Sequence, residues 1–132
     1  MAHLIHFATT AFDPSKETPN DINPIPGQGV LQWLREKLSG TPYAATEPAT
    51  EDWGWYIDVT GSGASYMVGA SGEPNDRSGL VDWILQIHKH RTLMQKLTGK
   101  NKLERNDEFV ALVSRLIRAD TSMENIIEEA DA

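Results

Sequence analysis

The order of apolar and polar residues predicts a strand, a long loop and a helix in the first third of the chain. Residues 3–9 carry Ile5 and Phe7 two positions apart, which is typical of one face of a β-strand. Residues 10–26 contain four prolines, so they are expected to form an ordered loop or extended chain rather than a helix. Residues 30–39 repeat apolar side chains at helical spacing, and Gly40 follows in the position of a helix C-cap.

The middle of the chain predicts a three-stranded meander. Residues 53–60 alternate, which places four apolar side chains on one strand face: Trp53, Trp55, Ile57 and Val59. Residues 61–63 are a Gly-Ser-Gly turn, and residues 64–70 form the returning strand. Residues 80–88 also alternate, although their apolar positions fit a helix as well. The strand is favoured because it completes the meander, whereas a lone hairpin is only marginally stable in water.

The last third of the chain predicts two helices and a final strand. Residues 91–102 are basic and indicate one or two helical turns or a loop, which Gly99 ends. Asn106 is expected to cap the following helix, which has the clearest amphipathic pattern in the chain: Phe109, Leu112, Val113, Leu116 and Ile117. Residues 124–129 are interpreted as a short strand, with a helix as the alternative.

These elements fit one α+β domain over residues 1–132. Two amphipathic helices need an apolar sheet face to cover. We therefore expect a mostly antiparallel sheet of about five strands with two helices packed on one face.

The composition narrows the class of protein further. The chain has no cysteine, which excludes disulfides, thiolate metal sites and cysteine nucleophiles. No apolar stretch reaches the length of a signal peptide or of a membrane span. We expect a cytoplasmic protein of bacterial type that has no membrane partner.

Acidic residues outnumber basic ones, and the two kinds are unevenly distributed. The formal net charge of −7 argues against the phosphate backbone of nucleic acid as a partner. Residues 1–87 hold four basic and eleven acidic side chains. Residues 88–118 hold eight basic and three acidic side chains, and residues 119–132 hold five acidic side chains and no basic one. The basic segment is either a solvated helical face with a loop or a docking surface for an anionic partner.

The most unusual segment is Glu51-Asp52-Trp53-Gly54-Trp55, which follows Glu47-Pro48. One interpretation is a core anchor, in which both tryptophans share the buried face of a strand that an acidic turn introduces. The other is an aromatic floor edged by carboxylates, which can hold a cationic ligand or a basic side chain of a partner. The candidate binding residues are therefore Glu51, Asp52, Trp53, Trp55 and Asp58.

This segment resembles one found in a group of small bacterial proteins of uncharacterised function. The group shares the glutamate-proline pair and the aspartate-tryptophan-glycine-tryptophan run, followed by a strand, a hairpin and a strand. The basic stretch of this chain is also similar to theirs, around Arg91, Leu93, Leu97 and Gly99, as is a short final strand after a helix. The resemblance spans about residues 25–130; it supports the fold and implies no activity.

No short motif indicates catalysis or a metal site. His88 and His90 have a spacing that can bind zinc or copper, but no third ligand is near them in the sequence. Residues 26–29 precede a helix, whose N-terminus can hold an anion, yet they lack the lysine and hydroxyl of a phosphate loop. Residues 69–72 lack the glycine spacing of a nucleophile elbow. We therefore predict no catalytic residue, no metal and no cofactor.

The leading functional hypothesis is a non-enzymatic protein-interaction module of regulatory or immunity-like type with a basic protein partner. The alternative is a small enzyme or small-molecule-binding domain. Its pocket would lie between the loop of residues 10–26 and the tryptophan strand, with Glu51, Asp52, Asp58 or His88 as titrating groups. Nucleic-acid binding through residues 88–118 is the weakest of the three. The oligomeric state is left open.

Overall fold

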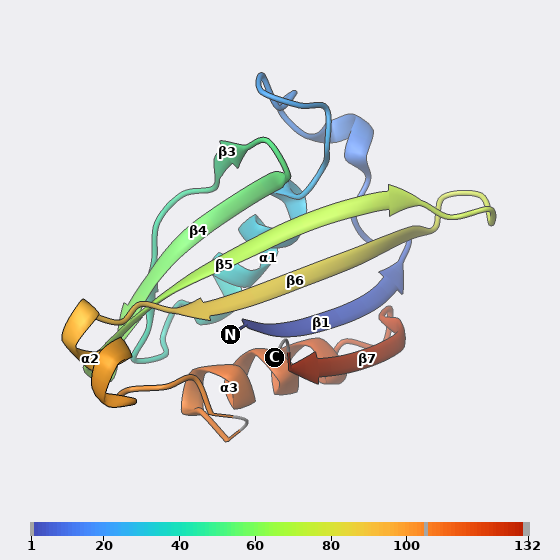
Figure 1. Cartoon of the computed structure of the whole chain (residues 1–132). Helices are drawn as coiled ribbons and strands as arrows, with labels where there is room; N and C mark the ends of the chain where they lie inside the picture. The colour runs from blue at the N-terminus through green and yellow to red at the C-terminus, as the bar shows by residue number, and fades with distance from the viewer. Residues whose placement is uncertain (1, 105, 131–132) are drawn as a thin grey trace.

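The computed structural model describes residues 2–104 and 106–130. In this part of the chain a seven-stranded sheet has the order β2-β4-β5-β6-β1-β7, with β3 also paired to β4 (Figure 1). Every neighbouring pair is antiparallel. The strands are β1 (Ala2–Thr9), β2 (Ala44–Ala45), β3 (Ala49–Glu51), β4 (Gly54–Gly61), β5 (Ala64–Pro74), β6 (Val81–Lys89) and β7 (Glu124–Ala130).

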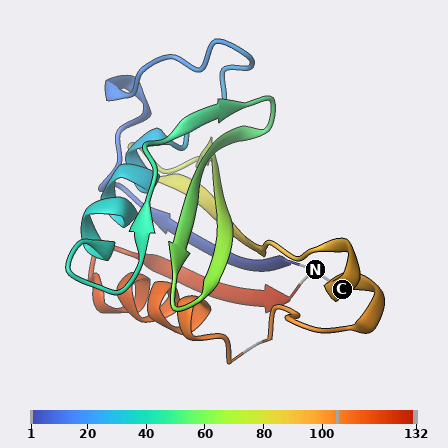
Figure 2. The same cartoon turned by 90° about the vertical axis from the view of Figure 1, so that its left-hand side faces the viewer.

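Three α-helices and one 3-10 helix accompany this sheet in the described residues: η1 (Pro14–Lys16), α1 (Gln28–Leu38), α2 (Leu93–Thr98) and α3 (Glu108–Ala119). One buried cluster joins the apolar stripes of α1 and α3 to the inward side chains of β1, β4, β5 and β6. In Figure 1, α1 lies behind β5 and β6, while α2 stands apart at one end of the sheet. Figure 2, turned by 90°, shows the loop between β1 and α1 at the opposite end of the molecule from α2.

The predicted class, α+β with a mostly antiparallel sheet, is confirmed, but about five strands was too few. β2 and β3 have two and three residues, which is too short for alternation to be visible in the sequence. Both ambiguous segments, β6 and β7, are strands. Residues 91–102 contain the short helix α2.

The expected cap of α3 was wrong by one residue. Asp107, not Asn106, is the N-cap, and its carboxylate accepts hydrogen bonds from the backbone N–H groups of Phe109 and Val110. The same carboxylate accepts the Tyr66 hydroxyl at 3.0 Å and pairs with Lys89 Nζ at 3.2 Å. Burial, followed by the hydrogen bond to Asp107, raises the pKa of Tyr66. Asp107 thus links β5, β6 and α3 in one largely buried polar cluster.

The N-terminus of α1 is capped by a carboxylate from the long loop. Glu17 Oε1 accepts the N–H groups of Gly27 and Gln28 at 3.0 and 3.1 Å, and Oε2 accepts that of Gly29 at 3.0 Å. A negative charge is favourable at a helix N-terminus, where backbone N–H groups lack helical partners. The sequence indicated that the helix N-terminus after residues 26–29 can hold an anion. In the structure the Glu17 carboxylate occupies that position.

Two asparagines fix the rest of the same loop to the turn between β3 and β4. The Asn20 side-chain amide donates to the carbonyl oxygens of Glu51 and Gly54, and the Asn23 amide donates to that of Asp52. The middle of this proline-rich segment, which has no regular structure beyond η1, is thus bonded to both the start of α1 and the β3–β4 turn. This arrangement fixes where the loop meets the sheet.

Glu128 fastens the edge strand β7 to β1 and α3. Its carboxylate accepts hydrogen bonds from His3 Nε2 at 2.8 Å, Ser114 Oγ at 2.7 Å and Arg118 NH2 at 2.7 Å. Burial on its own would raise the pKa of this carboxyl, but the hydrogen bonds from Ser114, His3 and Arg118 outweigh it and lower the pKa. The ionised form of Glu128 is therefore the one that holds β7.

We expect Glu17→Ala to lower the free energy of unfolding by about 1–2 kcal/mol, because three N–H groups lose their charged acceptor. Urea titration followed by circular dichroism measures this change. Glu36→Ala, on the exposed side of the same helix, serves as the control and should cost less than about 0.5 kcal/mol. Equal losses in the two variants would contradict the capping role.

We expect the contribution of Glu128 to stability to depend on pH with a defined sign. Because its folded-state pKa is lowered from 4.5, the stabilisation is fully present above pH 4.5 and is lost as the pH falls through the lowered value. Thermal unfolding of Glu128→Gln and of the wild type should differ most near neutral pH and converge in acid. A constant difference across this range would refute the assignment.

Candidate functional site

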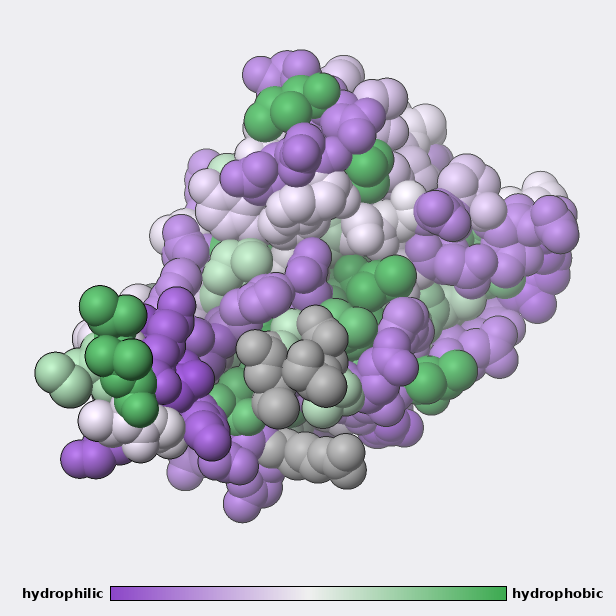
Figure 3. Space-filling view, viewed as in Figure 1, coloured by the Kyte–Doolittle hydropathy of each residue, from purple (hydrophilic) through white to green (hydrophobic). Residues whose placement is uncertain are grey.

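The sheet has one covered face and one open face, and the open face is unexpectedly apolar. Ile84 of β6 and Ile127 of β7 point away from the buried cluster and are 38% and 60% exposed. The open face of an antiparallel sheet normally carries polar side chains. Figure 3, drawn from the same side as Figure 1, shows apolar side chains in the middle of this face between hydrophilic ones. An exposed apolar area of this kind marks a candidate binding surface.

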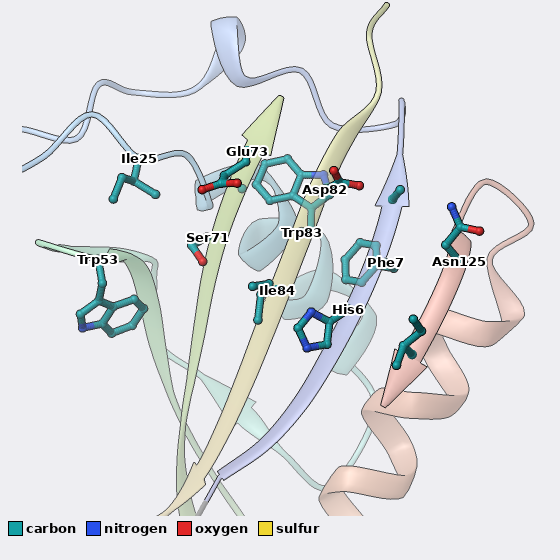
Figure 4. A pocket seen from close by; sticks show the side chains of 13 residues that line it. His6, Phe7, Ile25, Trp53, Ser71, Glu73, Asp82, Trp83, Ile84 and Asn125 are labelled. Atoms are coloured by element: carbon teal, nitrogen blue, oxygen red, sulfur yellow. The ribbon is translucent and has the colours of Figure 1, made fainter. Parts of the chain in front are cut away.

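A cavity of about 500 Å³ lies on this open face (Figure 4). Ile25 and Trp53 form one wall, and β1 and β7 form the opposite wall through His6, Asn125 and Ile127. In the same view α1 and α3 lie behind the strands, so the cavity opens away from the helices. Its volume is within the range of about 300–1,000 Å³ that is usual for ligand pockets.

Two glycines place Trp53 in this wall. Asp52 and Trp53 form the turn between β3 and β4, so Trp53 precedes the strand that it was expected to belong to. Gly54 then begins β4 with φ of 147°, and a Cβ at this position would clash with the carbonyl oxygen of Ala70. The indole crosses β5 above Gly69, where a Cβ would lie 2.5 Å from Trp53 Cη2. Only glycine permits both close approaches.

The two tryptophans are therefore on opposite faces, and the expectation that they share one face was wrong. Trp55 belongs to the buried cluster and is 4% exposed, so it acts as the core anchor. Trp53 is partly exposed and lines the cavity. The sequence interpretation of a core anchor therefore describes Trp55, and the interpretation of an exposed aromatic surface describes Trp53.

None of the sequence candidates except Trp53 lines the cavity. Glu51 ends β3 and Asp52 follows in the turn, so both directly precede Trp53 in the chain. Asp58 is exposed on β4, and its Oδ1 lies 3.8 Å from His90 Nε2. The structure thus brings Glu51, Asp52 and Trp53 together and leaves Asp58 apart.

The rim of the cavity is negatively charged. Glu73 of β5 and Asp82 of β6 face each other across the two strands at one end of the cavity, and both are exposed. Glu129 lies beside the opposite wall, with its Oε1 2.8 Å from His6 Nε2. Among the described residues that line the cavity there is no lysine or arginine. The surface therefore suits an apolar group that carries positive charge.

Sequence reasoning missed most residues of this cavity. Ile25 lies in the loop, and its place beside Trp53 depends on contacts far along the chain. Ile84 occupies a polar position of the alternating strand β6, which was a signal that the sequence did contain. β7 has no such alternation, so Ile127 gave no comparable signal. His6 belongs to no motif, and its place in the cavity depends on the pairing of β1 with β7.

The cavity offers few groups for chemistry. His6 and Glu129 form a pair, but Ser71, whose hydroxyl also lines the cavity, makes no hydrogen bond to His6. A nucleophile and its base need such contact in a hydrolytic site. Residues 2–104 and 106–130 contain no cluster of three or more histidine, aspartate or glutamate side chains able to hold a metal ion.

Comparison with known proteins adds no relative: no family model, no curated protein and no solved structure matches the chain. None of the helices in the described residues has the length and apolar character needed to cross a membrane.

We expect Gly69→Ala to displace the Trp53 indole and to lower the free energy of unfolding by about 1–3 kcal/mol through overpacking. Urea titration gives the change in stability, and tryptophan fluorescence should shift to the red as the indole becomes more exposed. In a Trp53→Ala background the cost of the same substitution should fall by at least half. An undiminished cost in that background would show that Trp53 does not depend on Gly69.

Proposed function

We propose that this protein is a non-enzymatic interaction module, regulatory or immunity-like, that holds a basic protein partner on the open face of its sheet. The observation that carries the proposal is the concave apolar surface with a carboxylate rim. A sheet face covered by helices needs no partner, whereas this face leaves Ile84 and Ile127 in contact with water.

The shape and composition of the surface support a protein partner. Trp53 offers a large, rigid aromatic surface at the edge of a concave region, and residues of this kind dominate the energetics of protein interfaces. The neighbouring isoleucines would be buried by a side chain inserted from the partner. Each buried apolar side chain would contribute on the order of 1.5–3 kcal/mol before the costs of association.

The charge of the surface supports a basic partner. Glu73 and Asp82 border the cavity, Glu51 and Asp52 directly precede Trp53, and the whole chain carries a net charge of −7. Complementary charge of this kind mainly accelerates association and excludes acidic competitors. A lysine or arginine beside an apolar anchor is the partner feature that this surface fits best.

The alternative, binding of a small molecule, is favoured by the cavity itself. Trp53 and Ile25 line it, at the place where the loop of residues 10–26 meets the tryptophan turn. A second cavity of about 340 Å³ lies between the same loop and Trp55. A ligand of either cavity would be recognised by apolar contact and a few polar groups.

We expect Ile84→Lys combined with Ile127→Lys to reduce capture of the partner at least tenfold, since both substitutions place positive charge in the apolar centre. The tagged protein and its variants are incubated with lysate of the organism that encodes it, and bound proteins are identified by mass spectrometry. Ile22→Lys is the matched control, because Ile22 is equally apolar, is 57% exposed and does not line the cavity.

The same experiment separates the two candidate functions. A stoichiometric basic protein that binds the wild type and the Ile22 variant, but not the double variant, supports the interaction module. Glu51→Gln with Asp52→Asn should then slow association and weaken its dependence on salt. Capture that is equal in all variants contradicts the proposed surface. If no protein is captured and a metabolite raises the melting temperature of the wild type alone, the small-molecule function replaces it.

A further inference from the structure

The other end of β6 leads into a third cavity, and its charge is opposite to that of the cavity on the open face. It measures about 450 Å³ and lies between the end of β6, the short helix α2 and the chain that follows α2. Its described lining residues are His88, Lys89, His90, Arg91, Lys96, Lys102 and Leu103. None of these is a carboxylate, and all but Leu103 carry a basic side chain.

Leu103 attaches one side of this cavity to the hydrophobic core, whereas polar interactions hold the α2 side. None of the residues of α2 is buried. A capping box between Thr92 and Gln95 starts the helix, and Gly99 ends it in the left-handed conformation. The guanidinium of Arg91 donates from Nε to the carbonyl of Lys100 at 3.1 Å and from NH2 to that of Gln95 at 3.0 Å. Arg91 thus connects the start of this segment to α2 and to the chain that follows it, and its guanidinium is held in place beside the cavity.

The positive charge of the cavity is only partly neutralised within the protein. Lys89 pairs with Asp107, which is itself shared with Tyr66. Arg91, Lys96 and Lys102 make no ion pair with any carboxylate in the described part of the chain. Residues 88–103 contain five lysines and arginines and no acidic residue, although the protein as a whole is acidic. Like charges held this close repel each other, and a bound anion would relieve that repulsion.

We propose that this cavity binds a ligand that carries clustered phosphate groups. Three unpaired cations match the charge of a di- or triphosphate better than that of a single carboxylate. The volume is many times the ~30 Å³ of one water molecule, so it is larger than a single small anion requires. Arginine and lysine are the usual phosphate-binding side chains, and a fixed guanidinium adds directional hydrogen bonds.

The lining favours recognition of phosphate and not of a nucleic-acid base. No phenylalanine, tyrosine or tryptophan is among the described residues that line the cavity; its planar groups are the imidazoles of His88 and His90 and the Arg91 guanidinium, which already donates to two backbone carbonyls, so a large aromatic surface for base stacking is absent from this lining. The exposed apolar residues of α2 lie outside the cavity: Leu93, Met94 and Leu97. The phosphates themselves are therefore the recognised groups, whether they are free or belong to a strand.

Calorimetric titration of the full chain with sodium tripolyphosphate at about 50 mM salt, where screening is weak, tests the proposal. We expect saturable binding at one site, weakened about tenfold by Lys96→Gln and by Lys102→Gln, since each loses a charge-assisted contact. Lys37→Gln and Arg115→Gln are the matched controls, because they remove exposed cations of α1 and α3 away from the cavity. These controls should bind as the wild type does.

Two further titrations identify the source of the phosphate. If a short single-stranded oligonucleotide binds more tightly than tripolyphosphate, and through the same two lysines, the phosphates of a strand are the ligand. If it binds no more tightly, the ligand is a free phosphorylated molecule. The proposal is overturned by absence of tripolyphosphate binding, by equal losses in the cavity and control variants, or by tighter binding of a polyglutamate peptide.

Discussion

The carboxylate of Glu17 satisfies three backbone N–H groups at the start of α1, and much of the open face depends on this contact. It bonds the proline-rich loop to the start of α1, while Asn20 and Asn23 bond the same loop to the β3–β4 turn. Held by these attachments, the loop places Ile25 in the same cavity wall as Trp53. A single charged cap thus connects a helix terminus, a loop and one wall of the larger cavity.

The opposite wall depends on a different carboxylate. Glu128 holds β7 against β1 and α3, which places Ile127 next to His6 on the open face. β7 is an edge strand, and edge strands that are not covered are prone to further pairing. Its glutamates therefore have two roles, since they anchor the strand on one side and leave an acidic edge on the other.

β6 connects two surfaces of opposite charge. Asp82 lies at the acidic rim near its start, whereas Lys89 and then Arg91 lead into the basic cavity at its end. This charge distribution would keep the proposed basic partner and the proposed phosphate ligand on separate parts of one small protein. The two surfaces share no lining residue, so each can be altered without the other.

The sequence by itself determined the elements that follow a regular period. Alternation identified β1, β4 and β5, and helical spacing identified α1 and α3, because side chains facing one core must repeat with the geometry of their own backbone. The pattern of β6 also fitted a helix, and the strand was favoured because it completes the meander. The uneven distribution of charge along the chain was also visible in the sequence, together with the unusual segment around Trp53. These features are local, so no knowledge of distant contacts was needed.

Only the tertiary structure decided how the candidate site is assembled. It separated Trp53 from Trp55, because the turn at Asp52 and the positive φ of Gly54 interrupt the alternation that one strand would have continued. It also brought Ile25, Ile84 and Ile127 to one cavity, although they lie in a loop and in two strands far apart in the chain. The spacing of residues along a chain describes the faces of single elements. Which faces meet is decided by contacts between residues far apart in the chain, such as helix caps, side-chain hydrogen bonds and core packing.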